Sequence, residues 1–339
     1  MITAATAVRV GDTDLFAPRV GLGTAALGNF LQAMSDADAV AVISRALASG
    51  VRYIDTAPLY GHGLAEQRAG QAIARAPQAG LVVSTKVGRL LREGAPRDDT
   101  QYHDGISFYQ EVPATGPMWD FSYDGVRQSA EESLERVGVG RFDILHMHDP
   151  DDHLEQAATT GYRALADLRA DGMVTAIGAG ANRSAPLAEL IRACDLDVVL
   201  LAGRYTLLDQ TAMADLLPLC VSRGVSVVIG GVFNSGILVD PVPGARFNYL
   251  PAERALLAKA RAIREICDSH DVPLAAAAIQ FPLAHPRVCT VLMGPRTIDE
   301  LETDLSLFEV EIPPQLWADL RRQGLLGADI PTPEQQGAL

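Results

Sequence analysis

Four residues that can move protons stand at or just after the ends of apolar runs in this sequence. Asp55 and Tyr60 lie five residues apart, directly after the apolar run that ends at Ile54. Lys86 and His148 each end a later apolar run. A carboxylate, a phenol, an ammonium and an imidazole at separate strand ends are the parts of a proton-transfer site.

These residue types also suit one another chemically. A tyrosine has an unperturbed pKa of about 10, so it needs a neighbour to tune it. We expect the Lys86 ammonium to lower the pKa of Tyr60, and Asp55 to keep the lysine charged and in place. His148 is expected to share the phenol proton or to orient a substrate oxygen. Each residue alone also has a structural explanation, but their joint placement favours a site.

The elements that must position these residues alternate between strand and helix. Runs of strand length are apolar nearly throughout, as in parallel strands covered on both faces, and occupy 20–23, 51–55, 81–86, 142–148, 174–178, 197–201, 225–229 and 288–292. Segments with helical spacing occupy 37–48, 123–137, 154–170, 185–193, 211–222, 252–269 and 298–308. We also expect a hairpin over 7–16, and a tail over 313–339 with a helix at 316–323 and a loose end from 331.

Eight strands alternating with helices predict an α/β fold, a (β/α)8 TIM barrel built as one domain over residues 1–339. An open doubly wound sheet is the alternative, and it usually carries a Gly-x-Gly-x-x-Gly turn after its first strand. Here Gly21 and Gly23 are followed by Thr24-Ala-Ala-Leu27, which breaks that pattern, so close packing explains the glycines better. In the barrel, His146 shares a strand face with His148 but lies deeper, as a packing residue.

Two long segments follow the third and seventh strands, at the end where a barrel keeps its function. Residues 88–121 are rich in Asp, Pro and Gly, and residues 231–251 form the second segment. Both contain aromatic side chains, among them Tyr109, Trp119 and Phe233. We expect irregular loops that form walls of a substrate pocket, with mobile surface loops as the alternative.

The composition excludes several classes of partner. Apolar residues make up 48% and charged residues 21% of the 339, which is typical of an enzyme with a full core. A formal charge of −14 argues against binding to nucleic acid or to an anionic membrane surface. The four cysteines are far apart and show no metal-site spacing, as expected of free buried thiols in a reducing compartment. We therefore expect a cytoplasmic protein without a bound metal that acts on a small molecule.

The motifs around the four proton-moving residues resemble those of the aldo-keto reductase superfamily. They are Val20-Gly-Leu-Gly-Thr24, Asp55-Thr-Ala-Pro-Leu-Tyr60-Gly61, Ser84-Thr-Lys86-Val-Gly88 and Leu145-His-Met-His148-Asp-Pro150. The resemblance implies that the four residues form the catalytic tetrad of that family, and that a nicotinamide dinucleotide carries the hydride. Tyr60 would donate a proton to a carbonyl oxygen in reduction, or take the hydroxyl proton in oxidation.

The resemblance also implies a phosphate-binding turn near the C-terminus. Gly294 and the helix start at Thr297 offer backbone N–H groups, and Arg296 adds a cation. NADP-preferring relatives usually have a lysine at the Gly294 position and an arginine at the Glu300 position, so Glu300 favours NAD, while Arg296 leaves NADP open. Thr297 and Glu300 also match a capping box, which needs no ligand.

The chain departs from the family pattern where the nicotinamide would lie. Many members have Ser-Asn after the fifth strand, whereas Asn182 is shifted along in this chain. Ala202 replaces a common glutamine and Gly230 a common stacking tyrosine, for which Phe233 is the candidate replacement. The cofactor contacts expected at strand ends are thus Gly23, Thr24, Asn182, Gly230, Gly231 and Phe233.

Two further runs, 120–126 and 200–209, resemble the branch of the family that contains L-fucose dehydrogenase (D-threo-aldose 1-dehydrogenase) and pyridoxal 4-dehydrogenase. That resemblance implies oxidation of the anomeric hydroxyl of an aldose to a lactone with NAD(P). Pyridoxal oxidation to its lactone is the alternative, followed by general aldehyde or ketone reduction and by a catalytically silent regulatory subunit. We expect Tyr109 and Trp119 to contact the substrate by stacking and Arg204 by hydrogen bonding.

Overall fold

The computed structural model describes residues 6–77 and 79–333. Eight parallel strands of the described chain form a closed barrel. In chain order they are β3 (Val20–Gly23), β4 (Tyr53–Asp55), β5 (Val82–Val87), β10 (Phe142–His148), β11 (Val174–Ala181), β12 (Val198–Ala202), β13 (Ser226–Gly230) and β16 (Val288–Met293). The last strand pairs with the first, Val291 opposite Val20, which closes the ring. The predicted TIM barrel is confirmed, with strand bounds within about three residues of those expected from the sequence.

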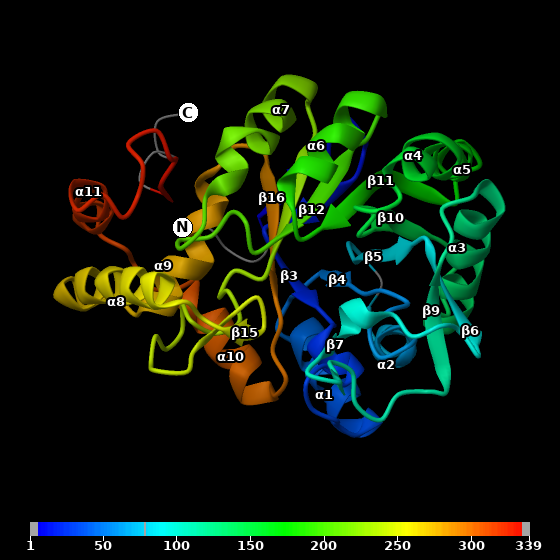
Figure 1. Ribbon diagram of the computed structural model, residues 1–339, viewed down its shortest axis with the longest axis horizontal. Helices are drawn as coiled ribbons and strands as arrows, with labels where there is room; N and C mark the ends of the chain where they lie inside the picture. Colours follow the sequence, from blue (N-terminus) through cyan, green and yellow to red (C-terminus); the bar gives the residue numbers. More distant parts are fainter. Residues whose placement is uncertain (1–5, 78, 334–339) are drawn as a thin grey trace.

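Helices surround the strands (Figure 1). They are α1 (Asp36–Ala48), α2 (Leu64–Ile73), α3 (Tyr123–Val137), α4 (Leu154–Gln156), α5 (Tyr162–Ala170), α6 (Ser184–Ala193), α7 (Leu216–Arg223), α8 (Arg254–Ser269), α9 (Leu274–Gln280), α10 (Ile298–Leu307) and α11 (Pro314–Arg322). Shorter turns are η1 (Ala26–Gly28), η2 (Asp99–Gln101), the π-type η3 (Ala157–Gly161), η4 (Thr211–Ala214) and η5 (Phe281–Ala284). At α3 the Ser122 hydroxyl accepts from the Gly125 N–H, and Gly138 ends the helix with φ 73°, so both ends are capped.

Two helices, α2 and α9, carry only a weak form of the pattern that identifies helices in sequence. In α2 the buried face includes Glu66 and Arg68, which are 0% and 3% exposed. Arg136 Nε donates to Glu66 at 2.5 Å, and Arg68 Nε donates to Asp36 at 2.8 Å. The apolar positions on that face are mostly alanines, with these ion-paired charges beside them, so the apolar stripe is weak. The α9 sequence, Leu274-Ala-Ala-Ala-Ala-Ile-Gln280, is mostly alanine and shows no period.

The two long segments expected to be irregular contain hairpins. After β5 the chain forms β6 (Arg89–Glu93), β7 (Tyr102–His103), β8 (Ile106–Ser107) and β9 (Thr115–Trp119), with β6 antiparallel to β9 and β7 to β8. After β13 it forms β14 (Arg246–Phe247) and β15 (Leu250–Pro251). The turn into β6 needs Gly88, because its φ is 93° and a Cβ there would collide with the Phe121 ring. Both segments start at the carboxyl ends of barrel strands, as predicted.

The amino-terminal end of the barrel is closed by a hairpin. Strands β1 (Ala7–Arg9) and β2 (Phe16–Pro18) pair antiparallel, close to the hairpin predicted over 7–16. Val10 and Ala17 of this hairpin belong to the apolar cluster inside the barrel, together with strand residues such as Ile144 and Val228. The larger apolar cluster lies between the strands and the surrounding helices.

The four cysteines, Cys194, Cys220, Cys267 and Cys289, are free and buried, as predicted. Burial raises the pKa of each thiol, to about 11 for Cys194 and Cys289 and about 12 for Cys220 and Cys267. No helix among the described residues is long and apolar enough to span a bilayer.

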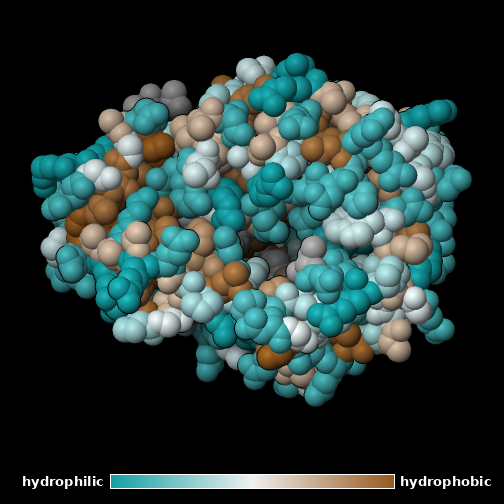
Figure 2. Space-filling view, viewed as in Figure 1, coloured by the Kyte–Doolittle hydropathy of each residue, from teal (hydrophilic) through white to brown (hydrophobic). Residues whose placement is uncertain are grey.

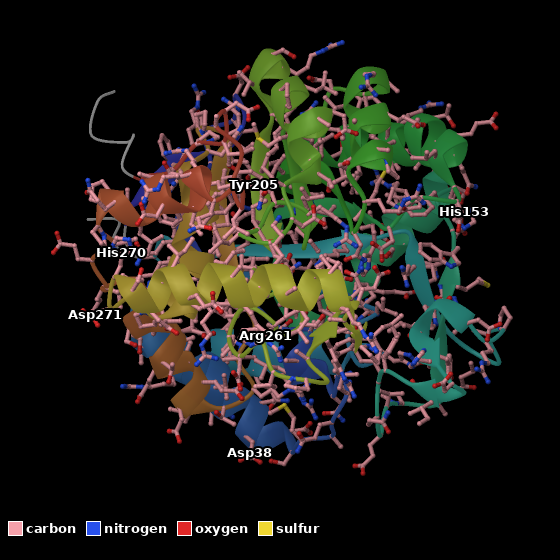
Figure 3. The ribbon with its side chains drawn as sticks, turned by 60° about the vertical axis from the view of Figure 1, so that its left-hand side comes forward. Asp38, His153, Tyr205, Arg261, His270 and Asp271 are labelled. Carbon is pink, nitrogen blue, oxygen red and sulfur yellow. The ribbon has the colours of Figure 1, made fainter. Side chains whose placement is uncertain are left out.

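The C-terminal tail contains the helix expected at 316–323, as α11, while only residues 331–333 of the expected loose end belong to the described chain. Trp317 and Leu320 of α11 are buried, and Arg321 donates to the Thr332 hydroxyl at 2.7 Å. His270, at the end of α8 (Figure 3), lies 2.9 Å from a carboxylate oxygen of Asp319, which ties α8 to α11. Residues 334–339 lie outside the described part of the chain.

Candidate active site

The four predicted residues come together at the carboxyl ends of adjacent strands. β4, β5 and β10 are neighbours in the barrel, with Asp55 paired to Ser84 and Lys86 to His146 in register. Side chains from the ends of these strands therefore point to one place, as expected in this fold. Tyr60 enters from the turn after β4.

Lys86 and Asp55 form a buried ion pair. Lys86 Nζ donates to Asp55 Oδ2 at 2.8 Å and to the Thr56 carbonyl at 2.9 Å. The Ser84 hydroxyl donates to the other Asp55 oxygen at 2.7 Å. The side chains of the pair are only 2% and 3% exposed. These extra hydrogen bonds are what a buried pair needs to offset its loss of hydration.

Tyr60 lies between the ion pair and His148. The Lys86 ammonium is 4.6 Å from the centroid of the Tyr60 ring. The Tyr60 and His148 rings meet edge to face, with centroids 5.9 Å apart and an angle of 89°. The turn that holds Tyr60 requires glycine at Gly61, where φ is 65° and a Cβ would collide with the Gly28 carbonyl oxygen.

The protonation states of Tyr60 and His148 follow from burial. Burial raises the pKa of Tyr60 well above its usual value, and the nearby carboxylates of Asp55 and Asp149 act in the same direction. The net lowering of the Tyr60 pKa expected from Lys86 is not found, because burial of the phenol outweighs it. Burial lowers the pKa of His148 well below its usual value, with Arg89 and Lys86 adding to the effect. At neutral pH the site thus holds a neutral phenol and a neutral imidazole.

His146 lies one layer deeper inside the barrel, as predicted. It is 0% exposed, and neither ring nitrogen has a hydrogen-bond partner within the described chain. Burial lowers the pKa of its ring to about 3, so it is uncharged. Gly178 on the neighbouring strand leaves room for the ring, which fits a packing role.

The turn after β16 forms the Thr297 half of the expected capping box, while Glu300 reaches back to the N–H of Arg296 and not to that of Thr297. The Thr297 hydroxyl accepts from the Glu300 N–H at 3.1 Å, and Glu300 Oε2 accepts from the Arg296 N–H at 2.6 Å. The Arg296 guanidinium donates to the Phe30 carbonyl at 2.5 Å. Gly294 is exposed, and its surroundings are open. The first-turn N–H groups of α10 and the space at Gly294 fit a phosphate group.

The other expected cofactor contacts differ in where their side chains point. Thr24 is buried, and its hydroxyl donates to the Asp55 carbonyl at 3.0 Å, so it joins β3 to β4. Asn182 is exposed just beyond β11. Phe233 is partly buried and packs against the outer apolar cluster. Gly23, Gly230 and Gly231 stand at the carboxyl ends of β3 and β13, where their backbone can face a ligand.

The three expected substrate contacts take different positions. Tyr109 is buried in an aromatic cluster with Phe30, 5.2 Å between centroids, and burial raises its pKa well above the usual value, with Tyr60 adding to the rise. Trp119 stacks on Arg89, whose guanidinium carbon is 3.8 Å from the ring centroid. Arg204 donates to Asn248 in the loop after β13 at 3.0 Å, and to the carbonyl of its neighbour Gly203 at 2.9 Å.

Sequence reasoning missed three residues of this site, Phe30, Arg89 and Asp149. Phe30 forms one aromatic cluster with Tyr109 and with Phe108 and Tyr249, two aromatics of the long segments expected to form pocket walls, and the ring centroids are 4.8 to 6.0 Å apart. Arg89 and Asp149 form an ion pair at 2.7 Å beside the tetrad. In the sequence, only position marks Arg89 and Asp149, because each follows the end of a predicted strand by one to three residues.

The face shown in Figure 2 is hollowed near its centre. Within the described residues, no group of three or more His, Cys, Asp or Glu side chains is arranged to hold a metal ion. The arrangement is suited to moving a proton between Tyr60 and a ligand oxygen.

Comparisons with known proteins agree with this arrangement. The family model described as Aldo/keto reductase family matches residues 19–323. The chain is 40% identical to pyridoxal 4-dehydrogenase of Microbacterium luteolum, over 94% of this chain and 97% of that protein. It is 41% identical to D-threo-aldose 1-dehydrogenase of a Pseudomonas species, over 93% and 95%. An aldo-keto reductase structure from Bacillus halodurans in its holo form is similar with a TM-score of 0.73 and 26% identity, covering 96% of this chain and 97% of that one.

Proposed function

The chain belongs to the aldo/keto reductase family and is a nicotinamide-dependent oxidoreductase, and we propose from this premise that it oxidises the anomeric hydroxyl of an aldose to a lactone. The observation that carries the proposal is the contact of Tyr60 with His148 beside the buried Lys86–Asp55 pair. The likeness to D-threo-aldose 1-dehydrogenase supports the choice of substrate.

In the proposed reaction, His148 and Tyr60 hold the hydroxyl of the reacting carbon between them. When bound, the nicotinamide ring supplies the acceptor for the hydride that leaves this carbon. Tyr60 Oη takes the hydroxyl proton as the C=O bond of the lactone forms, so the C–H and O–H bonds break together. Lys86 stabilises the negative charge that Tyr60 carries when it acts as a base, and Asp55 holds Lys86 in position.

The residues present at the turn after β16 fit an adenosine phosphate. Gly294 and the α10 N-terminus would hold the phosphate groups, and the Glu300 carboxylate favours NAD because it would repel a 2′-phosphate. We expect Glu300→Arg to shift the ratio of kcat/KM for NADP over NAD upward by about tenfold or more. The neighbouring variant Glu302→Arg is the matched control, since Glu302 pairs with Arg45 outside this turn. An unchanged ratio in Glu300→Arg would leave Glu300 with its capping role alone.

Pyridoxal is the second candidate substrate. The aromatic cluster of Phe30, Phe108, Tyr109 and Tyr249 offers ring faces and edges that suit a pyridine ring. The likeness to pyridoxal 4-dehydrogenase supports it as well. Both substrates exist in water as cyclic hemiacetals, so one proton path serves both.

The test is a panel of substrates followed by NADH absorbance. L-fucose, D-arabinose, L-galactose and pyridoxal are incubated with the protein and NAD, and we expect turnover of at least one aldose in preference to pyridoxal. Tyr60→Phe should lower kcat by about 10²- to 10⁴-fold and leave NAD binding, measured by fluorescence titration, nearly unchanged. No turnover across the panel would reject this function, and full activity in Tyr60→Phe would reject the proton path.

The four buried free cysteines further support a location in the reducing cytoplasm.

A further inference from the structure

Asp149 stands directly beside the proposed reaction centre. Its Oδ2 lies 3.6 Å from His148 Nε2, and its side chain remains 25% exposed. Its backbone is in the left-handed region, with φ 42°, and its N–H donates to the Gly180 carbonyl at 2.8 Å. A non-glycine residue in this conformation is strained, and such strain is concentrated at functional sites.

A buried arginine holds the Asp149 carboxylate in place. Arg89 Nη2 donates to Asp149 Oδ2 at 2.7 Å, and its side chain is only 4% exposed. The Trp119 ring covers one face of the guanidinium at 3.8 Å, and an Asp98 oxygen lies 3.5 Å from Nη1. Burial raises the pKa of Asp149, and Arg89 acts in the opposite direction. Because Arg89 engages Oδ2, a ligand hydroxyl would bind the other carboxylate oxygen.

We propose that Asp149 accepts a hydrogen bond from the substrate hydroxyl on the carbon next to the reacting carbon, and so selects sugars that carry this hydroxyl. This inference rests on the proposed function. The reacting oxygen lies at His148 and Tyr60, and oxygens on adjacent carbons of a sugar are separated by about a hydrogen-bond length. The carboxylate, 3.6 Å from His148 Nε2 at its nearer oxygen, is close enough for a sugar whose reacting oxygen lies at His148 to reach it with the next hydroxyl.

The chemistry of a carboxylate makes the selection specific. An ionised carboxylate only accepts hydrogen bonds, so it favours the 2-hydroxyl, which donates, over the ring oxygen, which only accepts. In the cyclic form of pyridoxal, the carbon next to the reacting carbon bears no hydroxyl, and its phenolic hydroxyl stands one ring carbon further on. Asp149 therefore selects among aldoses by their 2-hydroxyl.

The test combines enzyme variants with a modified substrate. The aldose with the highest kcat/KM in the panel is compared with its 2-deoxy counterpart, in the unmodified protein and in Asp149→Ala. The unmodified protein should prefer the 2-hydroxy sugar by about 10- to 100-fold in kcat/KM, the range expected for a hydrogen bond to a charged group. In Asp149→Ala this preference should fall below about threefold, because the partner of the hydroxyl is gone.

Asp151→Asn is the matched control. Asp151 is two residues away, pairs with Arg183 at 3.6 Å, and its loss removes the same charge; it should keep the full preference. Asp149→Asn keeps the side-chain volume and should give an intermediate preference if the alanine variant fails to fold. Equal preferences in the unmodified protein and the Asp149 variants would overturn the inference, as would turnover of pyridoxal without any aldose. Absence of turnover with every hemiacetal would instead reject the proposed function.

Discussion

At the scale of single residues, burial beside the Lys86–Asp55 ion pair determines how Tyr60 can act. The Lys86 ammonium, 4.6 Å from the phenol ring, favours the phenolate, but burial of the phenol and the nearby Asp55 carboxylate act more strongly in the opposite direction. Tyr60 is therefore a neutral phenol at rest, ready to donate a proton in carbonyl reduction. In oxidation the same residue must first lose its proton.

This difference predicts opposite pH behaviour for the two directions. The pKa of Tyr60 is raised well above 10, so the phenolate fraction rises about tenfold per pH unit throughout the range from pH 7 to 9. The kcat/KM for oxidation should rise with the same slope, whereas that for reduction should stay flat. His148, with its pKa well below 6.5, should add no change between pH 6 and 8. Initial rates in both directions across pH 6 to 9 test this prediction. A kcat/KM for oxidation that rises around pH 6.5 and then levels off would contradict it.

At the scale of elements, the site depends on three neighbouring strands that end at the same level. The sequence allowed the strands β4, β5 and β10 to be predicted, because buried parallel strands are continuous apolar runs. The same reasoning missed α2, because Glu66 and Arg68 are buried by ion pairs with residues distant in sequence. Such pairs are set by tertiary packing and leave no periodic signal.

The ion pair between β4 and β5 should be costly to break from one side. Lys86→Met leaves the Asp55 carboxylate buried and unpaired, and should lower the free energy of unfolding by about 3–5 kcal/mol. The double variant Asp55→Asn/Lys86→Met should be more stable than Lys86→Met alone. Urea unfolding of the unmodified protein and the two variants measures these differences. Arg45→Met is the control, because it breaks the half-exposed Arg45–Glu302 pair and should change the free energy of unfolding by less than about 1 kcal/mol. A double variant less stable than the single one would contradict this account.

At the scale of the whole molecule, the first and last strands must meet to close the barrel. We propose that the chain is one domain, a view supported by this seam between β3 and β16. Arg19, 7% exposed, lies at the seam and donates to the carbonyls of Leu283 and Val288, the latter at 2.5 Å. Hydrogen bonds between residues so far apart in the chain could not be predicted from the sequence. Neither could the aromatic cluster that contains Phe30, Tyr109 and Tyr249. Both depend on loop paths that no local pattern specifies.

Arg19→Met should therefore destabilise the entire barrel. Two buried carbonyl groups would lose a charged donor, and the free energy of unfolding should fall by about 2–4 kcal/mol. Arg183→Met is the control, because the Arg183 side chain is 66% exposed and pairs loosely with Asp151. Urea titrations with a common slope would show the loss, and equal midpoints for the two variants would refute the role of Arg19 in closure.

The four buried thiols have a practical consequence for work on this molecule. They are distributed over the end of α6, over α7, over α8 and over β16, and each is held as an unreactive thiol by its raised pKa. A thiol reagent can reach them only when the surrounding structure opens. Labelling followed residue by residue in a mass spectrometer would thus report how readily each part of the native protein opens, without any substitution.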